Sequence, residues 1–152
     1  MRAIGVSNFT VKHLQELLEI ATIKPTVNQV ELHPYLPQTA LVKFCTDHDI
    51  VAEAYSPLGS GGQPSLLHDP TIVQLAKQLE MTPAQLLLSW GISRGTPVVF
   101  KTANPYRLTE NFNLGRLDAE AMREINNIGH TFRFCNPVDL WKRDCFNGDD
   151  RF

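Results

Sequence analysis

The sequence predicts an α/β fold in which four parallel strands alternate with helices. Short apolar runs recur along its 152 residues, and segments whose apolar residues follow helical spacing separate them. Polar or aromatic residues close each run, at Gly5–Phe9, Asn28–Glu31, Tyr55–Ser60 and Lys101–Thr102. Because ligands bind at the carboxyl ends of strands in a parallel sheet, these four segments predict a ligand site.

The first part of the chain predicts two βα units. Residues Ala3–Val6 form the first strand, and Thr10 caps a helix whose inward side chains follow helical spacing: Leu14, Leu17, Leu18 and Ala21. Lys24-Pro25 breaks this helix, and Val27–Val30 forms the second strand. After a turn-rich segment, the next helix carries on one side Leu41, Phe44, Cys45 and His48.

Ile50–Ala54 predicts the third strand, and a glycine-rich loop at Gly59–Gly62 leads from it into two helices. The first helix begins at Asp69-Pro70 and turns four side chains inward: Ile72, Val73, Ala76 and Leu79. The second begins at Thr82-Pro83, which combines a capping box with proline at the first helical position. Its buried face consists of Leu86, Leu87 and Trp90.

Pro97–Phe100 predicts the fourth strand, and two helices begin after Asn104 and Asp118, the second one ending at Gly129. We expect residues 1–129 to form one partial barrel and residues 130–152 an irregular, aromatic C-terminal tail. A closed (β/α)8 barrel needs eight strands and typically takes ~250 residues. The sequence therefore supplies about half of such a barrel.

Composition and charge disfavour several other classes of protein. The formal net charge is -2, without a long run of one sign, which gives no indication of a nucleic-acid or acidic-membrane partner. No apolar stretch approaches the roughly 20 residues that span a bilayer. Three cysteines are too few for a disulfide framework and stand at no metal-ligand spacing with the five histidines. We therefore expect a cytoplasmic protein without a metal.

The residues at the strand ends suit a nicotinamide dinucleotide. A neutral amide is matched by side chains that offer both donors and acceptors, namely Ser7, Asn8 and Gln29. Tyr55 offers a flat ring, and Lys101 with Arg107 offers positive charge for a phosphate group. No Gly-x-Gly-x-x-Gly motif follows a strand, which disfavours a Rossmann fold.

Taken in order, the four segments resemble the second half of the aldo-keto reductases, NAD(P)H-dependent enzymes built on a TIM barrel. The tail segments Arg133–Pro137 and Asp139–Trp141 are similar to those of fungal members that resemble glycerol dehydrogenases and xylose reductases. The resemblance implies the C-terminal half of a TIM (β/α)8 barrel. It also implies an NADP-dependent oxidoreductase that interconverts aldehydes or ketones and alcohols.

The resemblance assigns cofactor contacts residue by residue. The nicotinamide carboxamide is held by Ser7, Asn8 and Gln29, and its ring stacks on Tyr55. The pyrophosphate is lined by Ser56, Leu58 and Ser60. The ribose 2′-phosphate is held by Lys101, Thr102 and Arg107, and the adenine by Glu110 and Asn111. Phe100 departs from the family, which usually has proline before the lysine.

The resemblance also points to substrate contacts in the tail, at Cys135, Trp141 and Phe146. Cys135 stands where similar reductases of xylose have an asparagine that contacts the sugar, so the substrate is not indicated. Trp141 and Phe146 either roof a substrate pocket or pack against the helices. Elsewhere, His33 is interpreted as a loop-structuring residue, Cys45 and Trp90 as core, and Cys145 as an exposed thiol or solvent-facing residue.

The family reduces carbonyls with an Asp, Tyr, Lys and His set from the first half of its barrel, and nothing here matches that set. We therefore expect a truncated chain that starts inside a barrel and is inactive alone. Two alternatives stay open. One is a reductase of small carbonyl substrates, completed by a first half-barrel, and the other is a non-catalytic remnant or dinucleotide-binding module. In either case the open barrel edges favour self-association.

Overall fold

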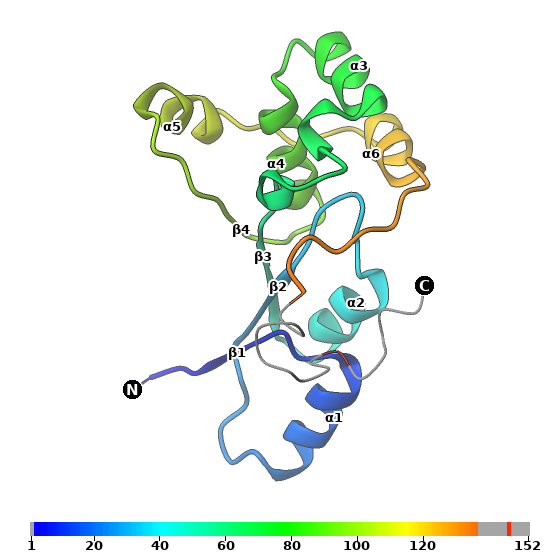
Figure 1. Ribbon diagram of the computed structural model, residues 1–152. Coiled ribbons are helices and arrows are strands. Elements are labelled where there is room, and N and C mark those ends of the chain that lie inside the picture. The colour runs from blue at the N-terminus through cyan, green and yellow to red at the C-terminus, as the bar shows by residue number, and fades with distance from the viewer. Residues whose placement is uncertain (1, 137–145, 147–152) are drawn as a thin grey trace.

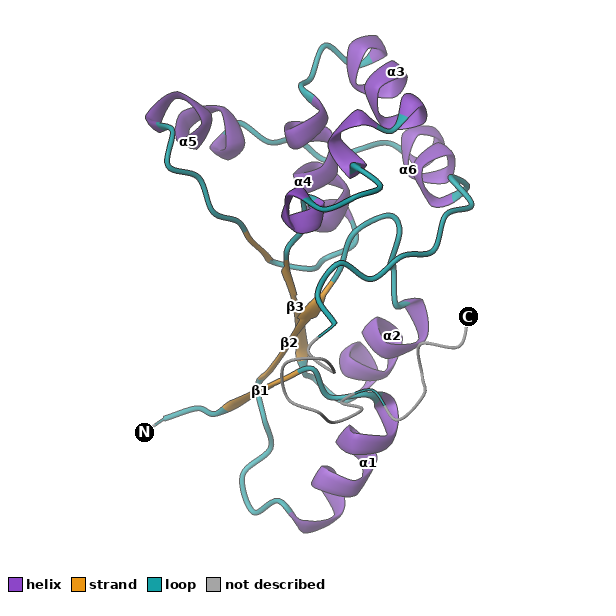
Figure 2. Ribbon diagram, in the orientation of Figure 1, coloured by secondary structure: helices purple, strands orange, loops and turns teal. Residues whose placement is uncertain are grey.

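The computed structural model describes residues 2–136 and residue 146, and its strands form one parallel four-stranded sheet in the order β1-β2-β3-β4. The strands, drawn in orange in Figure 2, are β1 (Gly5–Ser7), β2 (Val27–Glu31), β3 (Val51–Tyr55) and β4 (Val98–Val99). The α/β fold with four parallel strands is thus confirmed. The first strand begins at Gly5 rather than at Ala3, because its ladder with β2 starts at the Gly5–Val27 pair.

Six α-helices in the described part of the chain follow the expected order, and five of them begin at the cap residues read from the sequence. The helices are α1 (Val11–Ile20), α2 (Thr39–Asp47), α3 (Pro70–Gln78), α4 (Pro83–Ser93), α5 (Pro105–Phe112) and α6 (Ala119–Asn126). Backbone N–H groups of the first turn donate to the caps Thr10, Asp69, Thr82, Asn104 and Asp118. No helix in the described part of the chain is long and apolar enough to cross a membrane.

The strand register divides the sheet into two chemically different faces. Side chains alternate along each strand, so even-numbered residues of all four strands share one face. This face packs against α1 and α2, where Val30, Ala52 and Ala54 meet Leu14 and Cys45. Cys45 is fully buried, which confirms its place in the core. Figure 1 shows α1 and α2 together on this side of the strands.

A second apolar cluster joins α3, α4 and α6 around Trp90, which is a core residue as expected. Its indole Nε1 donates to Asn126 Oδ1 at 2.9 Å. The expectation that Val73 and Leu79 point inward was wrong, because they are 44% and 37% exposed. The buried stripe of α3 contains Leu75 instead, and α3 ends at Gln78, so Leu79 lies past the last helical turn.

The odd-numbered face of the sheet carries no helix from the described residues, as Figure 1 shows. Its first row across β1, β2 and β3 is Gly5, Val27 and Val51. Its second row is Ser7, Gln29 and Glu53, and its third, across β2, β3 and β4, is Glu31, Tyr55 and Val99. A polar row therefore separates the apolar residues of this face. Val51 and Val99 nevertheless remain 44% and 47% exposed.

We propose that the isolated chain self-associates through β1 and β4, because each is an unpaired edge of the sheet. Replacing Val99, on edge strand β4, with lysine should lower the mass measured by size-exclusion chromatography with light scattering. Val73→Lys is the matched control, because Val73 is similarly exposed but lies on α3. A sharp monomer for the unmodified chain would contradict the proposal.

Candidate functional site

The structure brings four of the expected cofactor residues together: Ser7 ends β1, Asn8 follows it, Gln29 lies in the middle of β2, and Tyr55 ends β3. Ser7 is the register partner of Gln29, and its hydroxyl donates to the Gln29 carbonyl oxygen at 2.9 Å. The Tyr55 hydroxyl donates to Asn8 Oδ1 at 3.0 Å. Asn8 has a φ of 59°, a left-handed conformation that asparagine tolerates better than most residues. This turn directs the Asn8 side chain towards Tyr55.

Tyr55 is held as a neutral ring. Burial, together with the negative charge of the nearby Glu31, raises the pKa of its phenol to about 12. The phenol therefore stays protonated at neutral pH and keeps donating to Asn8. A half-buried ring with a fixed hydroxyl offers a flat surface against which another ring can stack.

Unused polar atoms remain beside Tyr55. Gln29 Nε2 donates to the Glu53 carboxylate from the neighbouring strand. This bond fixes the Gln29 amide. Gln29 Oε1 and Asn8 Nδ2 then form no hydrogen bond with any described residue. One free acceptor and one free donor are what a primary carboxamide requires.

The loop after β3 brings two of the expected pyrophosphate residues into contact. Ser56 and Ser60 both have a φ of 49°, and their hydroxyl oxygens lie 2.6 Å apart. Cys135 of the tail joins them, with its Sγ 3.4 Å from Ser56 Oγ and 3.6 Å from Ser60 Oγ. Leu58 lies apart from this group, because its side chain packs against the core around Trp90. The structure thus places Cys135 beside the loop that carries Ser56 and Ser60, here called the serine loop.

The start of α5 forms a separate positively charged group. Lys101 and Arg107 are exposed, and neither forms an ion pair with any residue that the structure describes. Thr102 Oγ1 accepts a hydrogen bond from the Asn104 backbone N–H at 3.1 Å, and Asn104 caps the helix. Two cations beside a helix N-terminus form a favourable environment for an anion.

Glu110 and Asn111 lie on the side of α5 that faces α4. Figure 1 shows α5 on the opposite side of α4 from α3 and α6. The Thr82 hydroxyl donates to Glu110 Oε1 at 2.8 Å, so this carboxylate ties the two helices together. Asn111 is only 3% exposed, and its Oδ1 has no hydrogen-bond partner among the described residues. A buried acceptor without a partner is uncommon and indicates room for an additional donor.

Sequence reasoning gave no role to Glu31, which the structure places at the centre of the site. Its side chain is fully buried, and one carboxylate oxygen lies 2.7 Å from His33 Nε2. The backbone N–H groups of Phe134 and Cys135 donate to its two oxygens at 2.7 and 2.8 Å. A carboxylate only accepts, so His33 Nε2 is the donor. His33 is thereby confirmed as a residue that structures its loop.

Burial raises the pKa of the Glu31 carboxyl, but the hydrogen bonds from His33, Phe134 and Cys135 outweigh it. The pKa therefore lies below its ordinary value of 4.5, and Glu31 is ionised at neutral pH. The signal in the sequence was an acidic residue on the odd-numbered face at a strand end. That signal does not indicate what the carboxylate binds.

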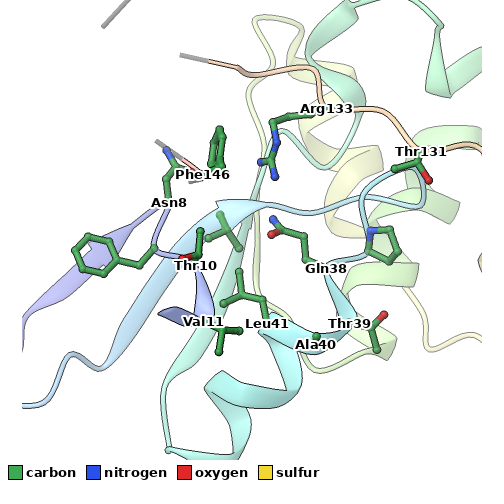
Figure 3. A pocket seen from close by; sticks show the side chains of 13 residues that line it. Asn8, Thr10, Val11, Gln38, Thr39, Ala40, Leu41, Thr131, Arg133 and Phe146 are labelled. Carbon is green, nitrogen blue, oxygen red and sulfur yellow. The ribbon is translucent and has the colours of Figure 1, made fainter. Parts of the chain in front are cut away.

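A pocket of about 510 Å³ lies beside these groups, between the start of α1, the start of α2 and the tail. Figure 3 shows side chains converging on it from Thr10, Gln38, Leu41, Arg133 and Phe146. Of the expected cofactor residues, only Asn8 lines it. Phe146 is 4% exposed and lies under the Arg133 guanidinium, so it packs as well as lining the pocket. Trp141 and Cys145 lie outside the described residues.

Comparison with known proteins places this chain in a family. The model of the aldo/keto reductase family matches residues 1–130. Glycerol 2-dehydrogenase (NADP(+)) of Hypocrea jecorina is 46% identical over 149 residues, covering 93% of this chain and 46% of the relative. Aldose reductase B of Dictyostelium discoideum is 42% identical over 149 residues, covering 97% of this chain and 48% of the relative.

Solved structures show the same likeness. Aldose reductase from Giardia lamblia is 36% identical and superposes with a TM-score of 0.87, covering 95% of this chain and 51% of that chain. An aldose reductase from Schistosoma japonicum covers 99% of this chain and 49% of that chain, with 30% identity and the same TM-score of 0.87. The chain spans about half the length of the relatives it matches. The four strands thus correspond to part of a TIM barrel, as expected from the sequence.

We expect Glu31 to make the stability of the protein sensitive to acid. Because its folded pKa is depressed, its contribution is present above pH 4.5 and is lost as the pH falls through the folded pKa. At neutral pH, Glu31→Gln should lower the free energy of unfolding by about 1.5–3 kcal/mol, the size of hydrogen bonds to a charged group. Urea denaturation should show this difference shrinking as the pH falls below 4.5.

Glu19→Gln removes an exposed carboxylate from α1 and serves as the control, with no change expected at either pH. An equal dependence of unfolding on pH in Glu31→Gln and the unmodified chain would show that Glu31 is not the titrating group.

Proposed function

The chain belongs to the aldo/keto reductase family, and on that premise we propose that it is the cofactor-binding half of an NADP-dependent oxidoreductase. The substrate class is carbonyl compounds and the corresponding alcohols. The observation that carries the proposal is Tyr55, whose hydroxyl is fixed by Asn8 on the face of the sheet that also carries Ser7 and Gln29. The relative from Hypocrea jecorina is named for NADP(+), which supports this cofactor.

The nicotinamide end of the cofactor fits the group around Tyr55. The unused Gln29 Oε1 can accept from the carboxamide NH₂, and Asn8 Nδ2 can donate to the carboxamide oxygen. Stacking on Tyr55 leaves the opposite face of the ring open to a substrate. A ring held in this way presents its reacting carbon in one orientation, which lowers the entropy cost of reaction.

The adenosine end fits the groups around α5. Lys101 and Arg107 can form charge-assisted hydrogen bonds with a 2′-phosphate. Asn111 Oδ1, which is buried without a partner, can accept from the exocyclic amine of adenine. The side chains of Ser56 and Ser60, which contact each other, can offer hydroxyls to the pyrophosphate.

NADPH would supply a hydride, and the residues of this chain bind and orient it. Among the described residues that we propose to contact the cofactor, none is placed to give a proton to a carbonyl oxygen beside the ring. The Tyr55 hydroxyl donates to Asn8, and the raised pKa of about 12 makes this phenol a weak acid. We therefore propose that the isolated chain lacks the general acid of the complete enzyme and does not reduce carbonyls.

Arg107→Ala should raise the dissociation constant for NADPH by about tenfold or more, because a charge-assisted contact is lost. The constant for NADH should hardly change, since NADH has no 2′-phosphate. Fluorescence titration measures both. Arg123→Ala is the control, because Arg123 is an exposed arginine on α6 that pairs with Glu120. Equal weakening of NADPH and NADH by Arg107→Ala would contradict the assigned role.

The purified chain should show no protein-dependent loss of NADPH absorbance with glyceraldehyde. Positioned general-acid catalysis is worth roughly 10²–10⁴-fold, and cofactor binding does not replace it. A steady oxidation of NADPH that Tyr55→Phe abolishes would instead identify Tyr55 as the acid. Cofactor binding without turnover would fit a dinucleotide-binding module equally well. Adding a first half-barrel from a relative distinguishes the two functions, because only the half of a reductase should then gain carbonyl reduction.

A further inference from the structure

The Glu31 carboxylate joins the end of β2 to a tail segment more than a hundred residues away. Its two oxygens accept from the consecutive backbone N–H groups of Phe134 and Cys135, whose sequence separations from Glu31 are 103 and 104 residues. Two neighbouring N–H groups on one carboxylate fix both the position and the direction of a backbone segment. The position of the tail backbone at Phe134 and Cys135 is therefore set by Glu31.

The side chains of this tail segment lie on the loop after β3. A Cβ on Gly59 would lie 3.0 Å from Phe134 Cε2, and one on Gly62 would lie 2.7 Å from Phe134 Cδ1. The Phe134 ring can therefore approach this closely only because both positions are glycine. Next to it, the Cys135 thiol contacts the hydroxyls of Ser56 and Ser60.

The loop needs such support. Ser56 and Ser60 both adopt a positive φ of 49°, which costs free energy for a residue with a side chain. A conformation of this kind persists when surrounding contacts hold it. In the described structure, the tail contacts through Phe134 and Cys135 cover this loop.

We propose that Glu31 is a positioning residue, which fastens the Phe134–Cys135 backbone and through these two side chains holds the Ser56–Gly62 loop in the shape that receives the cofactor pyrophosphate. This rests on the function proposed above. The carboxylate touches neither Ser56 nor Ser60 and acts through the tail. Packing alone would not require it, because apolar residues can replace buried ionised groups without loss of stability.

The first test measures the tail in the cofactor-free chain. Iodoacetamide labelling of Cys135, followed by trypsin and mass spectrometry, separates this thiol from Cys145, because cleavage can occur after Arg133, Lys142 and Arg143. Glu31→Gln should accelerate Cys135 labelling by about tenfold and raise hydrogen exchange over residues 56–62. Exchange in α4 should stay unchanged. Unchanged labelling in a folded Glu31→Gln protein, or faster labelling without faster loop exchange, would overturn the proposal.

A second variant perturbs the same contact from the loop side. Gly62→Ala places a methyl group against Phe134 without altering Glu31, and should also accelerate Cys135 labelling. Gly115→Ala is the matched control, because the nearest atom to its added Cβ is Met81 Cε at 3.8 Å. If Glu31→Gln does not fold, Gly62→Ala decides: labelling at the rate of the unmodified chain would overturn the proposed coupling.

Ligand binding distinguishes positioning from a general structural role. Both variants should weaken NADPH binding by about tenfold. The binding of adenosine 2′-monophosphate should stay unchanged, because that ligand has no pyrophosphate and reaches only the α5 group. Equal weakening of both ligands would overturn the proposal. If the unmodified chain binds neither ligand, the proposed function fails. Labelling and exchange then still decide whether Glu31 holds the tail and the loop together.

Discussion

The parallel register of β1, β2 and β3 is the constraint on which the rest of this structure depends. Because side chains alternate along a strand, the register assigns Val30, Ala52 and Ala54 to the face covered by α1 and α2. The same alternation assigns Ser7, Gln29 and Tyr55 to the other face. A slip by one residue would exchange the two sets, burying polar groups and exposing the core. Stability and the site are thus fixed by one pairing pattern.

Buried polar groups connect the elements that surround this sheet. Asn28 binds the backbone of Phe9 through both ends of its amide, which fixes the turn between β1 and α1. The Tyr35 hydroxyl donates to Asp69 Oδ2 at 2.7 Å, while Asp69 also caps α3. Each group is fully buried or nearly so and has a partner. Such contacts cost a large desolvation penalty when broken, so they favour one arrangement of loops over others.

The order of βα units explains how half a barrel can carry most of the residues proposed to bind one cofactor. Ligands of parallel α/β proteins contact the loops that follow the strands, and each βα unit contributes its own loop. Four consecutive units therefore present neighbouring loops whatever lies beyond β1 and β4. The residues proposed here to bind the ring, the pyrophosphate and the phosphate lie on β1, β2 and β3 or in the segments that follow β1, β3 and β4.

The sequence by itself determined the order of elements, the helix starts at Thr10, Asp69, Thr82, Asn104 and Asp118, and the residues at the strand ends. These are local signals, because a cap or a strand end is defined by residues within a few positions. The structure alone decided that Leu58 packs into the core, that Glu110 binds Thr82, and that Cys135 reaches the serine loop. It also decided the role of Glu31, whose tail partners lie more than a hundred residues away. A contact between distant segments depends on how the chain packs, and no local pattern of residue types encodes it.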